Sequence, residues 1–125
     1  MAKTVLRVDD ERNIMLSLKH LMLRAGYRVL QASDGEQALE IAQASPPDLI
    51  LLDVMIPGRD GYDVCQTLRA NPTTQHVQII MLTAKGQEVE IEKGLALGAN
   101  DYMTKPFSTT ELVEKVKSLL GDGDG

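Results

Sequence analysis

Five short apolar runs recur along the chain and alternate with longer segments of mixed polarity. The runs are rich in branched residues, which favour β-strands, and they cover Thr4–Val8, Arg28–Gln31, Leu49–Leu52, Ile79–Leu82 and Tyr102–Met103. The third run is apolar at every position rather than at alternate positions, as is typical of a parallel strand covered on both faces. The pattern therefore predicts a central buried strand at Leu49–Leu52.

The intervening segments carry apolar residues at helical spacing. Three stripes stand out: Ile14, Leu18, Leu21 and Met22; then Ala38, Leu39 and Ala42; then Leu112, Val116 and Leu119. A Ser-x-x-Glu capping box opens the last of these segments at Ser108. Strand and helix alternating five times predict a doubly wound α/β sheet, which binds ligands at the carboxyl ends of its strands.

Length and composition fit one folded domain. The chain has 125 residues, of which 43% are hydrophobic and 25% charged, as in ordinary globular proteins. We expect one domain over residues 1–120, followed by a flexible tail or linker stub over the Gly/Asp residues 121–125. A net charge of -5 argues against a nucleic-acid surface, because phosphate backbones are bound mainly by clustered Lys and Arg.

The sequence contains neither a secretory hydrophobic segment at its amino end nor an apolar run that could span a bilayer. We therefore expect a cytoplasmic protein. Cys65 is the single cysteine, which excludes an intramolecular disulfide and thiolate metal clusters, and its predicted place is the core. Neither His20 nor His76 has a second histidine positioned to form a metal site.

Three carboxylates follow predicted strands. Asp9 and Asp10 close the first strand and Asp53 closes the third, so the sheet would bring them together at one edge. A single aspartate at a strand end is more often a cap or a turn residue. Three clustered carboxylates repel one another, and a hard divalent cation such as Mg²⁺ relieves that repulsion.

Thr83 and Lys105 follow the fourth and fifth predicted strands. Taken singly, each is an ordinary strand-end residue. Together, a hydroxyl and an ammonium around an aspartyl phosphate would stabilise its oxygens. These positions predict phosphoryl chemistry beside the metal.

Five motifs occur in order along the chain: VDDE at Val8–Glu11, DLILLD at Asp48–Asp53, MIPGRDG at Met55–Gly61, TA at Thr83–Ala84 and KPF at Lys105–Phe107. In these motifs the sequence from Lys3 to Leu120 resembles the response-regulator receiver family. The resemblance implies a flavodoxin-like fold, with a five-stranded parallel sheet in the order 2-1-3-4-5 and five flanking helices.

The resemblance also implies a role for each matching residue. Asp53 would be the phosphoacceptor, and Asp9 and Asp10 the acids on the metal side. Asp10 and Asp53 would be the direct ligands of Mg²⁺ or Mn²⁺, together with the backbone carbonyl of Met55. The phosphoryl group would be contacted by Thr83 and Lys105.

Two further residues match positions of the family, one in its switch and one at a cis peptide bond. Tyr102 occupies the aromatic switch position, whose ring would turn inward as Thr83 moves toward the phosphate. Pro106 would follow a cis peptide bond, which proline makes accessible.

The implied function is that of a phosphoacceptor in a two-component phosphorelay. A sensor histidine kinase or phosphotransfer protein would donate the phosphoryl group, and the domain would catalyse its own phosphorylation and dephosphorylation without being a classical enzyme. The output surface would be the fourth helix, fifth strand and fifth helix, with no direct contact to nucleic acid. The chain would be a stand-alone receiver or the first domain of a transcription factor.

Dimerisation on phosphorylation is left open by the sequence. Relatives that dimerise carry a charge pattern that this chain matches at Lys93, Asp101, Glu111 and Lys115. It departs from that pattern at Asn100 and Leu119.

Three other functions fit parts of the pattern. A flavin-binding electron carrier would need a Ser/Thr/Gly-rich phosphate loop where this chain has Asp9-Asp10-Glu11. A hydrolase with an aspartyl phosphate would carry an Asp-x-Asp pair at a strand end, and no predicted strand of this chain ends in such a pair. An interaction module of the same fold that does not respond to phosphate would leave the acids, Thr83 and Lys105 without a purpose.

Arg7 departs from the family, which usually has Val or Ile in this strand. Period-two alternation places Arg7 and Asp9 on one face, about 7 Å apart. Three interpretations remain: the side chain extends past the helices to solvent, it forms an ion pair near the acidic site, or it is an introduced or harmful substitution.

Overall fold

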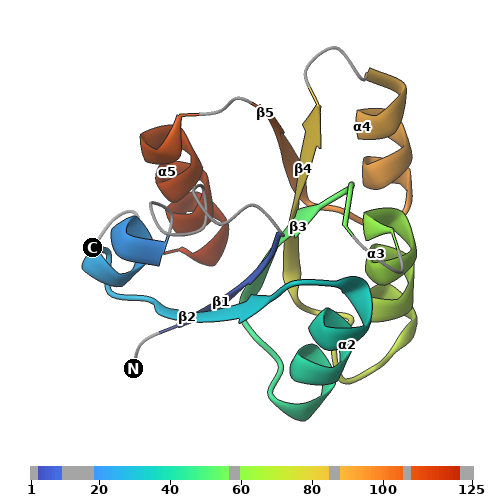
Figure 1. The fold of residues 1–125 in the computed structure, drawn as a ribbon, viewed down its shortest axis with the longest axis horizontal. Helices are drawn as coiled ribbons and strands as arrows, with labels where there is room; N and C mark the ends of the chain where they lie inside the picture. The colour runs from blue at the N-terminus through green and yellow to red at the C-terminus, as the bar shows by residue number, and fades with distance from the viewer. Residues whose placement is uncertain (1–2, 10–18, 57–59, 85–87, 106–107, 122–125) are drawn as a thin grey trace.

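Five parallel strands form one sheet in the order β2-β1-β3-β4-β5. The computed structural model describes residues 3–9, 19–56, 60–84, 88–105 and 108–121. The strands are β1 (Thr4–Val8), β2 (Arg28–Ala32), β3 (Leu49–Asp53), β4 (Gln78–Ala84) and β5 (Asp101–Lys105). The predicted strand order is confirmed, and β3 is the central strand (Figure 1).

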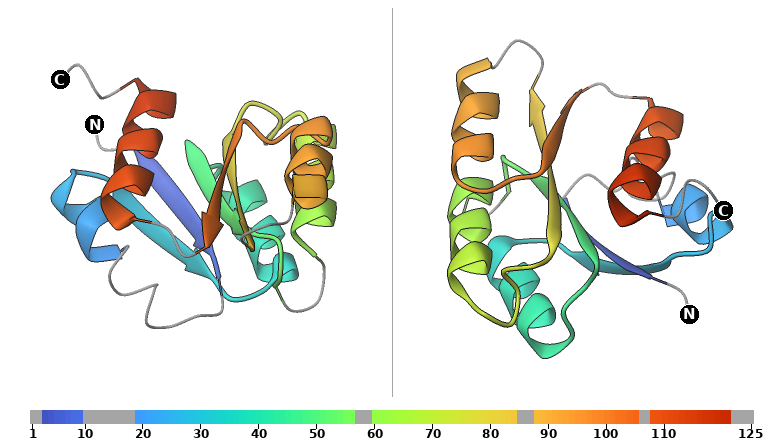
Figure 2. Two further views of the ribbon diagram at one scale, coloured as in Figure 1. Left: turned by 90° about the horizontal axis from the view of Figure 1, so that it is seen from above. Right: turned by 180° about the vertical axis from the view of Figure 1, so that it is seen from behind.

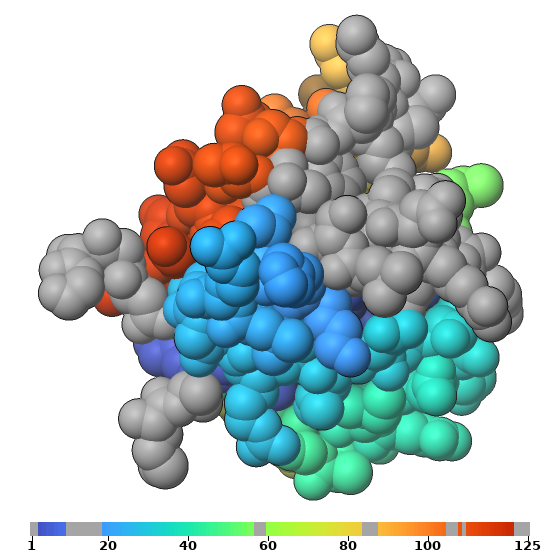
Figure 3. All heavy atoms as spheres, turned by 60° about the vertical axis from the view of Figure 1, so that its left-hand side comes forward, coloured from blue at the N-terminus to red at the C-terminus, as the bar shows by residue number. Residues whose placement is uncertain are grey.

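Helices cover both faces of the sheet. They are α2 (Gly35–Ala44), α3 (Gly61–Ala70), α4 (Glu88–Ala96), α5 (Thr109–Leu120) and a helical segment over residues 19–24. Figures 1 and 2 show α2, α3 and α4 on one face, and α5 with residues 19–24 on the other. Figure 3 shows that second side, with residues 19–24 and α5 next to each other. The doubly wound, flavodoxin-like architecture is therefore confirmed.

Side-chain caps fix where the helices begin. The side chains of Asp34 and Asp60 accept hydrogen bonds from the backbone N–H groups of Gln37 and Asp63, each at 2.8 Å. Ser108 accepts from the N–H of Glu111 at 3.3 Å, which confirms Ser108 as the cap of α5. Each cap satisfies a donor that has no partner within its own helix.

Two apolar cores flank the sheet. The α2–α3 core is built on Leu6, Val8, Ile50, Leu52, Ile79 and Met81, and the α5 core on Val5, Leu49, Leu51, Ile80 and Leu82. Alternate residues of each strand enter opposite cores, and all five residues of β3 are buried. The predictions of a doubly covered central strand and of a buried Cys65 are both confirmed.

The structure corrects some boundaries. Thr83 and Lys105 do not follow their strands but lie within them, Thr83 next to last in β4 and Lys105 last in β5. On α5, Leu120 is buried, whereas the predicted Leu119 is only partly buried. Residues 122–125 of the predicted tail lie outside the described residues. Within the described part of the chain, no helix is long and apolar enough to cross a membrane.

Asn100 joins three segments beside the start of β4. Its Oδ1 accepts hydrogen bonds from Arg69 of α3 at 2.7 Å and from the backbone N–H of Ile79 at 2.8 Å. Arg69 also donates to the carbonyls of Gly98 and Gln75, each at 2.9 Å. Asn100, which departs from the charge pattern of the dimerising relatives, thus has a structural role, since its amide oxygen connects α3, β4 and the turn before β5.

We expect Asn100→Ala to lower the free energy of unfolding by about 1–3 kcal/mol, because the N–H of buried Ile79 loses its side-chain acceptor. Asn100→Asp retains that acceptor and serves as the matched control, with less than half of this effect. Urea denaturation followed by circular dichroism measures both. Equal losses in the two variants would show that the acceptor is not what stabilises this junction.

Candidate functional site

Two buried carboxylates meet at the carboxyl edge of the sheet. Val8 of β1 and Leu52 of β3 are partners in register, so the next residues, Asp9 and Asp53, lie on neighbouring strand ends. Their exposed fractions are only 3% and 2%. Parallel strands are about 4.8 Å apart, so the two like charges are close and poorly solvated.

The turn after β3 orients Asp53. Its Oδ1 accepts a hydrogen bond from the backbone N–H of Met55 at 2.9 Å, and the N–H of Gly61 donates to the carbonyl of Val54 at 3.1 Å. α3 therefore begins directly against the end of β3. Hydrogen bonds and packing hold the carboxylate at the sheet edge.

Thr83 lies on the strand next to Asp53, one residue beyond its register partner. Asp53 pairs in register with Leu82, and Thr83 is the following residue. Its Oγ1 is buried and has no hydrogen-bond partner among the described residues. A buried hydroxyl in that state costs about 1–3 kcal/mol, and an acceptor delivered from outside the protein would remove that cost.

Tyr102 lies on the same face of the sheet as Thr83. The register Met81 to Tyr102 and Thr83 to Thr104 makes Thr83 and Tyr102 diagonal neighbours on β4 and β5. The Tyr102 side chain is 38% exposed. It thus extends from a position close to Thr83 to the surface.

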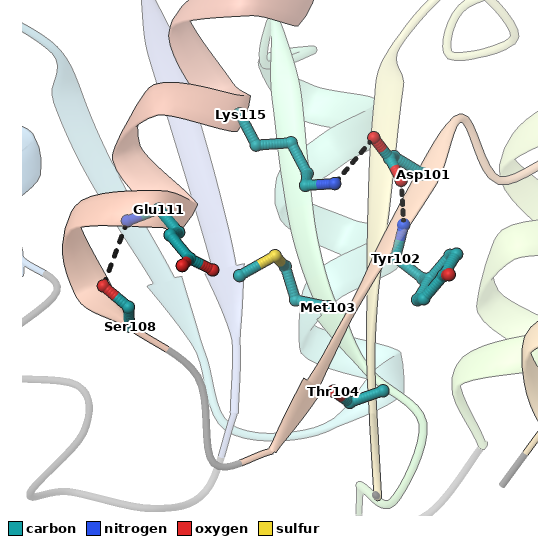
Figure 4. A pocket seen from close by; sticks show the side chains of 7 residues that line it. All are labelled: Asp101, Tyr102, Met103, Thr104, Ser108, Glu111 and Lys115. Atoms are coloured by element: carbon teal, nitrogen blue, oxygen red, sulfur yellow. Dashed lines mark hydrogen bonds and ion pairs between the residues drawn. The ribbon is translucent and has the colours of Figure 1, made fainter. Parts of the chain in front are cut away.

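A polar groove runs beside β5, lined by Asp101, Tyr102, Met103, Thr104, Ser108, Glu111 and Lys115 (Figure 4). Lys115 pairs with Asp101 at 3.0 Å, and its ammonium is 6.0 Å from the centroid of the Tyr102 ring. The groove includes neither Asp9 nor Asp53, so it is separate from the acidic edge.

Arg7 is buried on the face that carries Asp9 and Asp53. Its exposed fraction is 1%, and it pairs in register with Gln31 and Leu51. Burial lowers the pKa of its guanidinium from the usual value, and the negative charge of Asp9 partly opposes that decrease. The interpretation that Arg7 extends past the helices to solvent is wrong.

Other predicted site residues are only partly described. Asp10 and Pro106 lie outside the described residues, and for Lys105 the backbone alone is described. Met55 follows β3 with an exposed side chain. His20 and His76 are both exposed, away from the acidic edge.

The donor set at this edge fits a hard divalent cation. Asp9 and Asp53 offer carboxylate oxygens, the ligand type that Mg²⁺ prefers. They are buried close together, which favours a positive charge between them. In the part of the chain that is described, no group of three or more His, Cys, Asp or Glu side chains could hold a metal, and the sequence assigns the third carboxylate to Asp10.

The sequence analysis missed Gly61 as a residue that shapes the site. A Cβ at this position would lie 2.6 Å from the carbonyl oxygen of Asp53 and 2.8 Å from the Cα of Val54. These neighbours are backbone atoms and cannot move aside easily. Gly61 ended the MIPGRDG motif, but only the packing of α3 on β3 reveals why a glycine is needed.

We expect Gly61→Ala to displace the backbone of Asp53 and to lower the free energy of unfolding by about 1–3 kcal/mol, as overpacking does. The matched control is Gly94→Ala in α4, where the nearest atom to an added Cβ is Met81 Cγ at 3.3 Å, in a flexible side chain. Amide resonances of Asp53 and Val54 report the displacement. Unchanged resonances and stability in Gly61→Ala would contradict the close packing.

Comparisons with known proteins agree with this geometry. The family model described as response regulator receiver domain matches residues 5–117. The alkaline phosphatase synthesis transcriptional regulatory protein PhoP of Bacillus subtilis (strain 168) is 50% identical over 120 residues, covering 96% of this chain. This chain spans 49% of the length of that relative.

Two solved structures are similar to this chain over nearly their whole length. One from Chloroflexus aurantiacus J-10-fl has a TM-score of 0.92 and 40% identity, with 97% of this chain and 99% of that chain covered. The receiver domain of the sensor histidine kinase PA1611 from Pseudomonas aeruginosa PAO1, solved with a magnesium ion coordinated in its active site cleft, has a TM-score of 0.87 and 33% identity. That similarity covers 97% of this chain and 99% of the other. With its sheet order, its acidic edge and these matches, the chain belongs to the response regulator receiver domain family.

Proposed function

We propose that this receiver domain accepts a phosphoryl group on Asp53 from a phosphohistidine of a sensor histidine kinase or a phosphotransfer protein. The proposal rests on a buried carboxylate at Asp53, oriented by the N–H of Met55, and on the buried hydroxyl of Thr83 on the adjacent strand, which has no hydrogen-bond partner among the described residues. The carboxylate provides the nucleophile. The hydroxyl provides a donor for an incoming oxygen.

The transfer is an in-line displacement at phosphorus. A carboxylate oxygen of Asp53 attacks, the P–N bond to the donor imidazole breaks, and the imidazole nitrogen retains the electron pair and takes up a proton. No general base is needed, because a carboxylate nucleophile has no proton to lose as it attacks. Hydrolysis by water later returns Asp53 and inorganic phosphate, so the domain promotes both its phosphorylation and its dephosphorylation without acting as a classical enzyme.

Asp9, Asp10 and Asp53, together with the backbone carbonyl of Met55, would hold Mg²⁺ or Mn²⁺. When bound, the cation supplies positive charge that offsets the phosphoryl oxygens. The close, buried carboxylates support this assignment, as does the magnesium ion reported for the PA1611 receiver domain. The protein's own part is to hold the acids in place against their mutual repulsion.

Thr83 and Lys105 would contact the phosphoryl group, and Tyr102 would transmit the change to α4, β5 and α5. The diagonal arrangement of Thr83 and Tyr102 supports this path. The proposed output surface carries exposed apolar side chains that suit a protein partner, namely Val89, Leu95 and Tyr102. The Lys105–Pro106 bond would be cis.

We assign the receiver to residues 1–120 and a tail or linker to residues 121–125, and we propose a cytoplasmic location. The domain would not bind nucleic acid itself. Homodimerisation through α4, β5 and α5 on phosphorylation would require Asp101 and Lys115 to exchange their present intrachain ion pair for contacts to a second copy.

Asp53→Asn is expected to abolish labelling by acetyl phosphate in the presence of Mg²⁺, because the amide keeps the shape of the side chain and loses the nucleophile. Asp48→Asn serves as the matched control, because Asp48 is exposed and directly precedes the amino end of β3, whereas Asp53 ends that strand. This variant should label like the wild type. Intact-protein mass spectrometry measures the added phosphoryl group. Persistent labelling of Asp53→Asn at the wild-type rate would remove Asp53 as the acceptor, and absence of labelling in the wild type would favour a phosphorylation-independent interaction module.

Thr83→Val is expected to retain Mg²⁺ affinity within about twofold but to lose the response of Tyr102 to beryllofluoride, since only the hydroxyl is removed. Folding stability should be unchanged or higher, because the substitution removes a buried hydroxyl that has no hydrogen-bond partner among the residues that the structure describes. Thr104→Val is the control, because it removes the hydroxyl of the residue that pairs in register with Thr83. It should keep the wild-type response to beryllofluoride. If beryllofluoride shifts the backbone resonances of Tyr102 equally in Thr83→Val and in the wild type, the hydroxyl is not the relay.

A further inference from the structure

Arg7 lies directly below the acidic edge, on the same face of the sheet. Successive strand residues alternate between faces, so Val5, Arg7 and Asp9 share one face of β1. On β3 the matching series is Leu49, Leu51 and Asp53, and Arg7 pairs in register with Leu51. Arg7 therefore lies two residues before Asp9 on β1 and is a diagonal neighbour of Asp53 on β3.

Apart from Gln31, its register partner on β2, the described neighbours of Arg7 in the sheet are apolar. Val5 and Leu51 belong to the α5 core, and Arg7 is among the largest fully buried side chains of the described residues. A guanidinium remains protonated in proteins, so this position introduces a positive charge into an apolar layer. Such a charge is tolerated when an opposite charge lies within reach, and Asp9 is about 7 Å away along the strand.

The electrostatics agree with this pairing. The carboxylate of Asp9 acts on Arg7 in the direction that favours the charged guanidinium. The same attraction must act on Asp9, because a Coulomb interaction is mutual. Asp9, one of the two described carboxylates at the edge, thus has a positively charged residue near enough to interact with it.

We propose that Arg7 is a built-in counter-ion of the acidic site, which compensates Asp9 when no cation is bound and lowers the affinity of the site for divalent cations. This regulatory role rests on the proposed metal site at Asp9, Asp10 and Asp53. Asp9 and Asp53 alone present two negative charges, and with Arg7 their sum falls to one. A divalent cation entering the site is then attracted less strongly and is also repelled by the guanidinium.

The consequence is a receiver whose acidic edge is stable without metal and responds only to higher Mg²⁺ concentrations. In the metal-free state the guanidinium reduces the repulsion between the buried carboxylates. In the metal-bound state it becomes an unfavourable neighbour of the cation. Arg7 therefore shifts the equilibrium from the metal-bound state toward the metal-free state.

Calorimetric Mg²⁺ titration of the full chain tests this role. Arg7→Val removes the charge, Arg7→Met does the same with an unbranched stem in case one variant folds poorly, and Arg7→Lys retains the charge. Arg28→Val, at the exposed amino end of β2, changes the net charge equally and is the matched control. We expect at least about tenfold tighter Mg²⁺ binding in Arg7→Val and Arg7→Met, and changes below about twofold in Arg7→Lys and Arg28→Val.

Thermal melts in EDTA and in saturating Mg²⁺ provide a second readout. The increase in melting temperature caused by Mg²⁺ should be larger in the two neutral Arg7 variants than in the wild type, since ligand stabilisation grows with affinity. Mg²⁺ affinity and Mg²⁺-induced stabilisation equal to wild type in both neutral variants would overturn the inference. That outcome leaves the proposed function intact as long as Asp53 is labelled by acetyl phosphate, whereas loss of wild-type labelling contradicts the proposed function itself.

Discussion

Repulsion between buried carboxylates at the carboxyl edge of the sheet is the constraint on which the rest of the site depends. Parallel strands end together, so β1 and β3 present Asp9 and Asp53 side by side, and burial removes most of the water that would screen them. Positive charge must come from elsewhere. The structure places Arg7 beneath these acids, and a divalent cation and Lys105 complete the compensation that we propose.

The fold holds this unfavourable arrangement in place through backbone contacts. β3 is buried on both faces, so its end cannot move without disturbing two cores. Gly61 allows α3 to begin against the backbone of Asp53, and the N–H of Met55 fixes the carboxylate. On the neighbouring strand the hydroxyl of Thr83 has no hydrogen-bond partner in the described part of the chain, so the switch that we propose would start from a donor free to bind a phosphoryl oxygen.

The sequence predicted the fold well because alternating strands and helices leave a strong periodic signal. It located β1 and the buried β3, but it placed Thr83 and Lys105 beyond their strands, since strand ends carry little periodic information. The adjacency of Asp53 and Thr83 depends on register, and the contacts of Asn100 depend on tertiary packing. The sequence left three interpretations of Arg7 open, and burial excluded only the solvent-exposed one.

Chemical mapping of the phosphorylated residue tests the central assignment most directly. Borohydride reduces an acyl phosphate of aspartate to homoserine, which peptide mass spectrometry then locates in the chain. After treatment with acetyl phosphate and Mg²⁺, we predict homoserine at position 53 and its absence when EDTA replaces Mg²⁺. Reduction at another carboxylate, or equal modification of Asp53 with and without the cation, would contradict the account.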